Sequence, residues 1–127
     1  MADPLPAGTV LLVEDEPEIR RFIVNVLAAR GYVVLEAHDG EQALALCRQC
    51  PDPIHLLITD VIIPDTSGPA LAANVLALRP QVRLLYMSAF DAGVLKQSFG
   101  LSAKALFLPK PFSAEALLQK VRDVLRD

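Results

Sequence analysis

The sequence predicts an α/β fold, a three-layer α/β/α sandwich around a five-stranded parallel sheet. Short apolar runs alternate along the chain with longer amphipathic stretches. The runs are apolar almost throughout, which is typical of parallel strands that are covered on both faces. The stretches between them have helical periodicity and are long enough to carry the chain from one parallel strand to the next.

Five apolar runs are predicted to be the strands, each of about five residues, a usual strand length. They are Thr9–Val13, Tyr32–Glu36, His55–Thr59, Val82–Met87 and Ala105–Leu108. Residues 1–8, which contain Pro4, Pro6 and Gly8, are expected to be a disordered leader. Residues 9–127 are expected to form a single domain.

Apolar stripes at helical spacing predict the helices between these strands. The first stripe runs from Ile19 to Leu27, and Gly31 after it is a helix stop. The other stripes run from Ala43 to Cys50, from Leu71 to Leu78 and from Leu117 to Leu125. Pro69 suits the first turn of the third helix, and Ser113 suits the N-cap of the last. We expect a further short helix over Asp91–Gly100.

Composition and charge exclude several classes of protein. The 127 residues suffice for one domain, and a hydrophobic content of 53% excludes intrinsic disorder of the whole chain. A net charge of −3 provides no basic face for nucleic acid or for an anionic membrane surface. No apolar run approaches the ~18 residues of a membrane span. With two Cys, the chain fits the reducing cytosol, and we expect a cytoplasmic location.

Charged and polar residues follow the predicted strands at the edge where such sheets bind ligands. Glu14 and Asp15 follow the first strand, Asp60 the third, Ser88 the fourth and Lys110 the fifth. Crowded carboxylates disfavour one another's ionisation, and a hard divalent cation, Mg²⁺ inside a cell, removes that conflict. A lysine and a hydroxyl beside such a cluster suit a phosphoryl group, because each contacts one of its oxygens.

The motifs at these positions resemble the receiver domain of two-component response regulators over Thr9–Leu125. The matching segments are VLLVEDE (10–16), TDVIIPDTSG (59–68), MSAF (87–90) and FLPKPF (107–112). The chain is most similar to the receiver modules of hybrid sensor histidine kinases, and an excised module is favoured over a single-domain regulator. The resemblance implies a flavodoxin-like receiver fold with the strand order 2-1-3-4-5.

The resemblance also implies a role for each residue at the strand ends. Asp60 would be the phosphoacceptor, which takes a phosphoryl group from a phosphohistidine. The Mg²⁺ ligands would be Glu14, Asp15, Asp60 and the backbone carbonyl of Ile62. Lys110 would pair with the phosphoryl oxygens, and the backbone of Ile62 and Ala89 would bind them as well. A carboxylate is a competent nucleophile once the incoming charge is neutralised, so the chemistry agrees with the resemblance.

Signalling and partners follow from the same resemblance. Ser88 would be the switch hydroxyl and Phe107 the aromatic residue that moves with it, which would change the surface of the fourth helix, fifth strand and last helix. The implied partners are a histidine kinase or a histidine phosphotransfer domain, and the same surface offers a homodimer interface. The chain would be no enzyme beyond its own phosphorylation and dephosphorylation. The peptide bond between Lys110 and Pro111 is expected to be cis.

Two apolar residues depart from the usual receiver pattern. Ile62 and Phe90 occupy positions that often carry polar side chains. Hydrolysis of the phosphoryl group needs a water in line with it, and neither side chain orients a water. We therefore expect slow loss of the phosphate.

The first apolar stripe is wider than packing on a sheet requires. Ile19 and Phe22 lie in the first turns, nearest the strand ends. By resemblance they would meet the helical bundle that carries the phosphorylated histidine, forming an apolar patch with Pro111 and Phe112. The alternative is that both are ordinary core residues.

Three other functions compete with a phosphorylated receiver. A degenerate receiver would act only through protein contacts, but the acidic pair, Asp60, Ser88 and Lys110 are all present. A haloacid-dehalogenase-type phosphatase needs a second Asp where this chain has Ile62. A Rossmann-type nucleotide-binding module needs a G-x-G-x-x-G loop after the first strand, where Glu14 and Asp15 stand instead.

Overall fold

Five parallel strands form the middle layer of the molecule. The structure is a computed structural model that describes residues 7–90 and 106–126. The strands are β1 (Gly8–Val13), β2 (Tyr32–Ala37), β3 (Leu56–Asp60), β6 (Arg83–Ser88) and β7 (Phe107–Pro109). Their order is β2-β1-β3-β6-β7, and every neighbouring pair is parallel. This is the predicted 2-1-3-4-5 order, because the two short strands in between belong to a separate hairpin.

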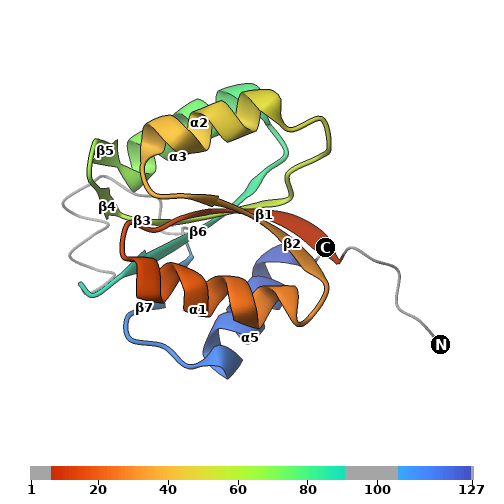
Figure 1. The fold of residues 1–127 in the computed structure, drawn as a ribbon, viewed down its shortest axis with the longest axis vertical. Helices are drawn as coiled ribbons and strands as arrows, with labels where there is room; N and C mark the ends of the chain where they lie inside the picture. The colour runs from red at the N-terminus through yellow and green to blue at the C-terminus, as the bar shows by residue number, and fades with distance from the viewer. Residues whose placement is uncertain (1–6, 91–105, 127) are drawn as a thin grey trace.

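Four described helices cover the two faces of this sheet. They are α1 (Pro17–Ala28), α2 (Gly40–Gln49), α3 (Gly68–Leu78) and α5 (Ala114–Leu125). Figure 1 shows α1 and α5 on one face and α2 and α3 on the other. None of the helices in the described ranges is long and apolar enough to cross a membrane. The helix predicted over Asp91–Gly100 lies outside the described residues.

Local sequence signals account for the ends of the helices. Ser113 accepts a hydrogen bond from Ala116 N, which confirms it as the N-cap of α5, and Ser67 caps α3 in the same way. After α1 the chain turns at Gly31, whose φ of 90° lies in the region that favours glycine. Each helix therefore begins and ends close to its predicted position.

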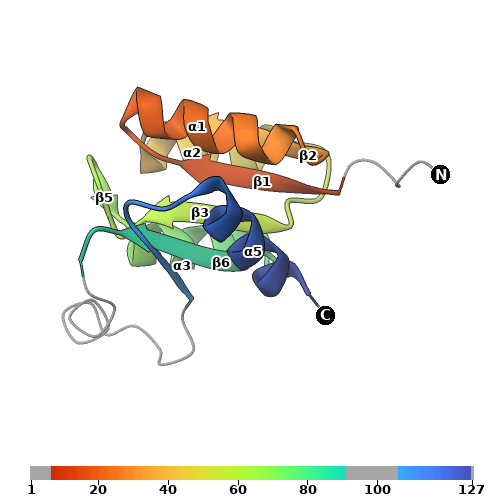
Figure 2. The same ribbon diagram turned by 90° about the horizontal axis from the view of Figure 1, so that it is seen from below.

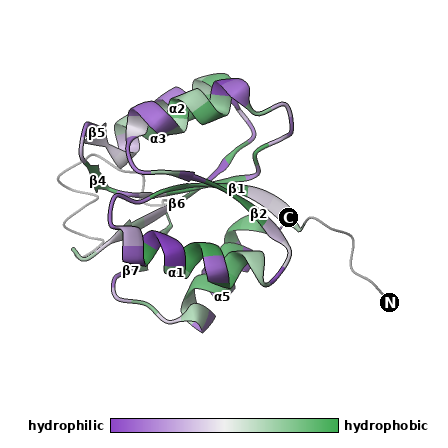
Figure 3. Cartoon of the chain, viewed as in Figure 1, coloured by the Kyte–Doolittle hydropathy of each residue, from purple (hydrophilic) through white to green (hydrophobic). Residues whose placement is uncertain are grey.

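Two apolar cores lie on opposite sides of the sheet. Leu11 and Val13 of β1 belong to the cluster under α2 and α3, whereas Val10 and Leu12 belong to the cluster under α1 and α5. All four are fully buried, as the alternating side chains of a doubly covered strand should be. Figure 3 shows the hydrophobic colour along the central strands, between the two helical layers.

The structure differs from the sequence-based prediction at three places. The first strand begins at Gly8, so the boundary of the expected leader moves; residues 1–6 lie outside the described part. The edge strand β2 is only partly covered, and Val33 is exposed. A small antiparallel hairpin of β4 (Ile62–Ile63) and β5 (Thr66–Ser67) follows β3. Figures 1 and 2 place this β4–β5 hairpin at the end of the sheet opposite the start of β1.

Candidate functional site

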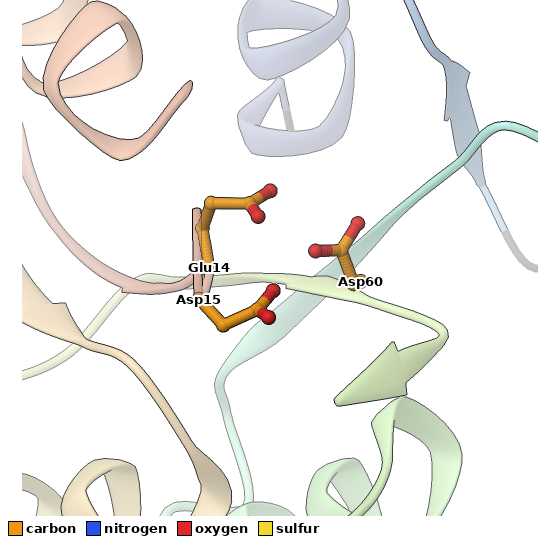
Figure 4. A group of neighbouring side chains, drawn as sticks. All are labelled: Glu14, Asp15 and Asp60. Atoms are coloured by element: carbon orange, nitrogen blue, oxygen red, sulfur yellow. The ribbon is translucent and has the colours of Figure 1, made fainter. Parts of the chain in front are cut away.

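Three carboxylates meet at the carboxyl ends of β1 and β3. Glu14 and Asp15 follow β1 directly, and Asp60 is the last residue of β3. Figure 4 shows the three side chains turned toward a common space, and oxygen atoms of all three lie within 4.8 Å of one another. Glu14 and Asp60 are buried, whereas Asp15 is exposed. Oxygen ligands of this kind and spacing fit a hard divalent cation such as Mg²⁺.

Lys110, which follows β7, bridges two of these carboxylates. Its Nζ lies 2.7 Å from Asp60 Oδ1 and 2.8 Å from Glu14 Oε1. The peptide bond from Lys110 to Pro111 is cis, as predicted. Burial lowers the pKa of Lys110, but hydrogen bonds to Asp60 and Glu14 outweigh this and raise it overall. The lysine therefore stays charged inside the site.

The electrostatic environment of Asp60 favours its protonated form when no cation is present. Burial raises the pKa of Asp60 to about 7, Lys110 opposes the rise, and Glu14 adds to it. Among the described residues, Lys110 is the one lysine in contact with this cluster of three carboxylates, so negative charge is in excess there when all three are ionised. Any cation that binds here competes with the proton on Asp60.

Hydrogen bonds hold both the carboxylate and the backbone carbonyl of Glu14 in place. Its Oε1 accepts from Lys110 and its Oε2 accepts from Glu16 N at 3.1 Å. Its backbone carbonyl accepts from Arg20 Nη1 at 2.7 Å, a contact that the sequence did not signal because Arg20 reads as part of a solvated helix face. Asp15, in contrast, accepts no hydrogen bond within the described ranges. Asp15 thus has the oxygens of the cluster that are freest to bind a cation.

The remaining strand-end residues surround a pocket of about 220 Å³ beside Asp60. Ser88, at the end of β6, is buried and its Oγ accepts from Phe90 N at 2.9 Å. Ala89 lines the same pocket, as do Ile62 and Phe90. The last two side chains are each 58% exposed, so both flank the opening of the pocket, as the sequence predicted.

Phe107 lies one strand away from this pocket. It is half-buried in β7 and pairs with Tyr86 of β6, with ring centroids 5.7 Å apart. By resemblance to receiver domains, Phe107 is predicted to be the aromatic residue that moves with Ser88. The structure brings both residues to neighbouring strands, since β6 and β7 are paired.

Gly68 allows the chain to pass close to Asp60. Its N–H donates to the carbonyl of Val61, and a Cβ at this position would overlap the backbone carbonyl oxygen of Asp60. This contact closes the loop between β3 and α3. This close approach explains why the segment TDVIIPDTSG (59–68) ends in glycine.

An apolar groove of about 410 Å³ opens beside Lys110. Ile19 and Phe22 of α1 form one wall, and Pro111 and Phe112 form the other. The rings of Phe22 and Phe112 are 6.3 Å apart, and Phe22 is 40% exposed, whereas Ile19 is half-buried against the core. We predicted exposure of both Ile19 and Phe22; Phe22 is exposed, Ile19 is only half-buried, and both line one groove with Pro111 and Phe112. Their role in docking stays a prediction.

The fold and the site together are those of a receiver domain of two-component signalling. The sheet is parallel and covered on both faces, and its carboxyl edge carries an acidic cluster bridged by a lysine. The chain belongs to this family, since the family model described as "Response regulator receiver domain" matches residues 10–122. Receiver domains bind Mg²⁺ in an acidic site and interact with histidine kinases or phosphotransfer proteins. The acidic cluster described above fits such a site.

Individual relatives come from both hybrid kinases and separate regulators. The chain is 34% identical to the sensor kinase CckA of Brucella abortus over 94% of its own length, but it spans only 13% of that protein. It is 29% identical to the response regulator receiver protein CpdR of the same organism, covering 91% of the chain and 95% of CpdR. The crystal structure of the receiver domain from hybrid histidine kinase CckA covers 94% of the chain and is itself covered completely, with 35% identity and a TM-score of 0.79. Chemotaxis protein CheY4 of Vibrio cholerae superimposes with a TM-score of 0.82 at 28% identity, covering 93% and 98% of the two chains.

Proposed function

We propose that this domain is a phosphoacceptor in a phosphorelay and that Asp60 receives the phosphoryl group from a phosphohistidine. The observation that carries the proposal is the position of Lys110, whose Nζ touches both Asp60 and Glu14. The positive charge of this lysine neutralises part of the negative charge of a phosphoryl group that approaches Asp60. The intact set of residues favours this role over that of a receiver that acts only through protein contacts.

The reaction moves one phosphoryl group between two side chains. An oxygen of Asp60 attacks phosphorus, the bond from phosphorus to the imidazole nitrogen breaks, and the neutral histidine leaves after taking up a proton. Asp15, Asp60 and the Ile62 carbonyl would hold Mg²⁺, with Glu14 acting through a water. When bound, Mg²⁺ would neutralise part of the negative charge on the phosphoryl oxygens. Lys110 binds one of these oxygens, and the backbone N–H groups of Ile62 and Ala89 bind others.

Phosphorylation would reach the surface through Ser88 and Phe107. The Ser88 hydroxyl now accepts from Phe90 N, and a phosphoryl group on Asp60 gives it a new acceptor to donate to. Movement of Ser88 along β6 opens space into which Phe107 turns from the neighbouring strand. The surface that changes includes β7 and α5, and it is the one we propose for output contacts and for a homodimer.

The donor would be a histidine kinase or a histidine phosphotransfer domain, and the protein would act in the cytoplasm. The similarity to the CckA receiver supports a module of a hybrid kinase. The domain would catalyse only its own phosphorylation and dephosphorylation. Its net charge of −3 argues against binding of nucleic acid or membrane lipids by charge alone.

Incubation with acetyl phosphate tests this function without a protein donor. The protein has no Trp, so intact-mass spectrometry is the suitable readout. We expect one phosphoryl group per chain with Mg²⁺ and none after chelation, with the modified peptide containing Asp60. Modification that persists in the chelator, or that maps to another residue, would contradict the proposal.

A second prediction concerns the lifetime of the phosphorylated state. Ile62→Asn should shorten it several-fold, because an amide at the mouth of the pocket can orient the attacking water that the exposed isoleucine cannot. Decay of the phosphorylated mass after removal of acetyl phosphate measures the lifetime. Ile62→Val is the matched control and should decay like the wild type. Equal lifetimes in all three proteins would show that Ile62 does not control access of water.

A third prediction separates docking from chemistry. Phe22→Asp should slow transfer from a phosphohistidine protein at least ten-fold, the loss expected when an interface residue worth about 1.4 kcal/mol is removed, but leave labelling by acetyl phosphate nearly unchanged. The apolar groove contacts a protein donor but is not needed by a small one.

Leu78→Asp provides the control for this experiment. Leu78 lies on α3, on the other face of the sheet, and is 43% exposed compared with 40% for Phe22. It should leave transfer from both donors unchanged. If Phe22→Asp impaired labelling by both donors equally, the groove would be part of the core rather than a docking surface.

A further inference from the structure

The β4–β5 hairpin reaches across to the start of α2. Asp65 stands in the turn of this hairpin, and its Oδ1 accepts from Gly40 N at 2.8 Å. Its Oδ2 accepts from Glu41 N at 2.9 Å. These are two of the four N–H groups at a helix start that have no partner within the helix. The carboxylate also lies at the positive end of the helix dipole.

The fit between hairpin and helix is close. A Cβ on Gly40 would lie 2.9 Å from the side chain of Thr66 and 3.3 Å from Asp65 Oδ1, so the hairpin needs glycine at this position. The two N–H groups hold the pKa of Asp65 below its ordinary value, Gly40 contributing most. No sequence pattern signals the contact between Asp65 and Gly40, which joins residues 25 positions apart.

The same hairpin leads directly into the site. Ile62 begins β4 two residues after Asp60, and it pairs with Ser67 of β5. On its far side the hairpin is closed by the bond from Gly68 N to the carbonyl of Val61. The hairpin is therefore held at two places, at the backbone next to Asp60 and at the N-terminus of α2. The attachment next to Asp60 is a bond between two backbone groups. The attachment to α2 depends on the side chain of Asp65.

We propose that Asp65 is a positioning residue that ties the hairpin to α2 and so holds the Ile62 carbonyl in place for Mg²⁺. This rests on the proposed function, because it assumes that the cluster of Glu14, Asp15 and Asp60 binds that ion. Asp65 contacts neither Asp60 nor the pocket beside it, so its effect on the site passes through the backbone of the hairpin. The Mg²⁺ affinity is the property that it should set.

A matched control comes from Asp39, the N-cap of the same helix. Its Oδ1 accepts from Gln42 N at 2.8 Å, so it stabilises α2 by the same kind of bond but does not join the hairpin. Asp65→Ala and Asp39→Ala each remove a capping carboxylate from one helix end. Only the first separates the helix from the hairpin.

The experiment titrates Mg²⁺ into each protein and follows the chemical shifts of backbone amides, which requires no phosphorylation. We expect Asp65→Ala to bind Mg²⁺ about ten-fold more weakly than the wild type, the lower end of the loss caused by removing an outer support of a metal site. Asp39→Ala should bind like the wild type. Asp65→Asn keeps one of the two acceptor oxygens, so its Mg²⁺ affinity should lie between those of the wild type and Asp65→Ala. It replaces Asp65→Ala in the experiment if that variant fails to fold.

Amide hydrogen exchange without Mg²⁺ supplies a second readout. The amide of Gly68, on the far side of the hairpin from Asp65, should exchange faster in Asp65→Ala than in Asp39→Ala. Equal Mg²⁺ affinity and equal Gly68 exchange in the two variants would overturn the proposal and make Asp65 an ordinary helix cap. A wild type that binds no Mg²⁺ would instead refute the proposed function, and the exchange of Gly68 would still decide whether Asp65 holds the hairpin.

Discussion

Replacing Asp60 by Asn should abolish phosphorylation and, in the metal-free protein at pH 8, raise the free energy of unfolding by about 2 kcal/mol, as removal of a buried ionic group can. In the proposed function the Asp60 carboxylate is the nucleophile, and an amide in its place is too weak a nucleophile to accept the phosphoryl group. The stability gain follows from the burial of Asp60 and its proximity to Glu14, which both disfavour its charged form. Lys110 keeps a partner in the variant, because Glu14 remains 2.8 Å away.

The stability difference should depend on pH in a defined direction. The pKa of Asp60 is raised to about 7 in the folded protein, so folding is favoured while Asp60 is protonated. That contribution is fully present below the ordinary carboxyl pKa of about 4 and is lost as the pH rises through about 7. The Asn variant has no such loss, so its advantage should grow from pH 4 to pH 7 and then level off.

Urea unfolding at several pH values, with a chelator present, measures this difference. Adding Mg²⁺ should stabilise the wild type and not the variant. Asp15→Asn is the control, because Asp15 is exposed and its charge costs less in the folded state. A stability difference that is constant across the pH range would show that Asp60 is charged throughout.

Replacing Lys110 by Met should lower the free energy of unfolding by about 3 kcal/mol, as expected when a buried ion pair loses one partner. Glu14 is fully buried, and Lys110 is the only positively charged partner of its carboxylate in the described structure. Labelling by acetyl phosphate should fall by about 10²–10³, the effect of removing one donor that stabilises a developing negative charge.

The matched control is Lys120→Met on α5, which has the same chemistry outside the site. Lys120→Met should change neither the free energy of unfolding nor the labelling by acetyl phosphate. Mg²⁺ should restore part of the stability lost in Lys110→Met, because a cation in the cluster again compensates the carboxylates. A variant that is as stable as the wild type and labels at the same rate would exclude Lys110 from the site.

Most of the fold was predictable because each element carries its own local signal. The strands show as apolar runs, the helices as stripes, and the start of α5 as Ser113 followed by an acidic first turn. The β4–β5 hairpin was missed, since strands of two residues have no recognisable periodicity. The exposure of β2 could not be foreseen either, because a strand at the edge of a sheet can have the same apolar sequence as one in the middle.

The site was predictable to the extent that topology alone assembles it. Parallel strands bring their carboxyl ends to one edge, which places Asp15, Asp60 and Lys110 together whatever the helices do. Contacts from side chains to backbone groups were not predictable. Arg20 donates to the Glu14 carbonyl, and Asp65 accepts from the amides of Gly40 and Glu41. Arg and Asp are usually solvated, and no sequence pattern marks the partners of these two residues.

The bond between Lys110 and Glu14 joins residues 96 positions apart, and the apolar groove likewise combines α1 with residues that follow β7. Both features therefore arise only when the two ends of the chain have come together. During synthesis, a chain that has not yet extended past Phe112 has neither the complete groove nor a compensated acidic cluster. With the groove in its proposed docking role, we expect such an unfinished chain to accept no phosphoryl group from a protein donor.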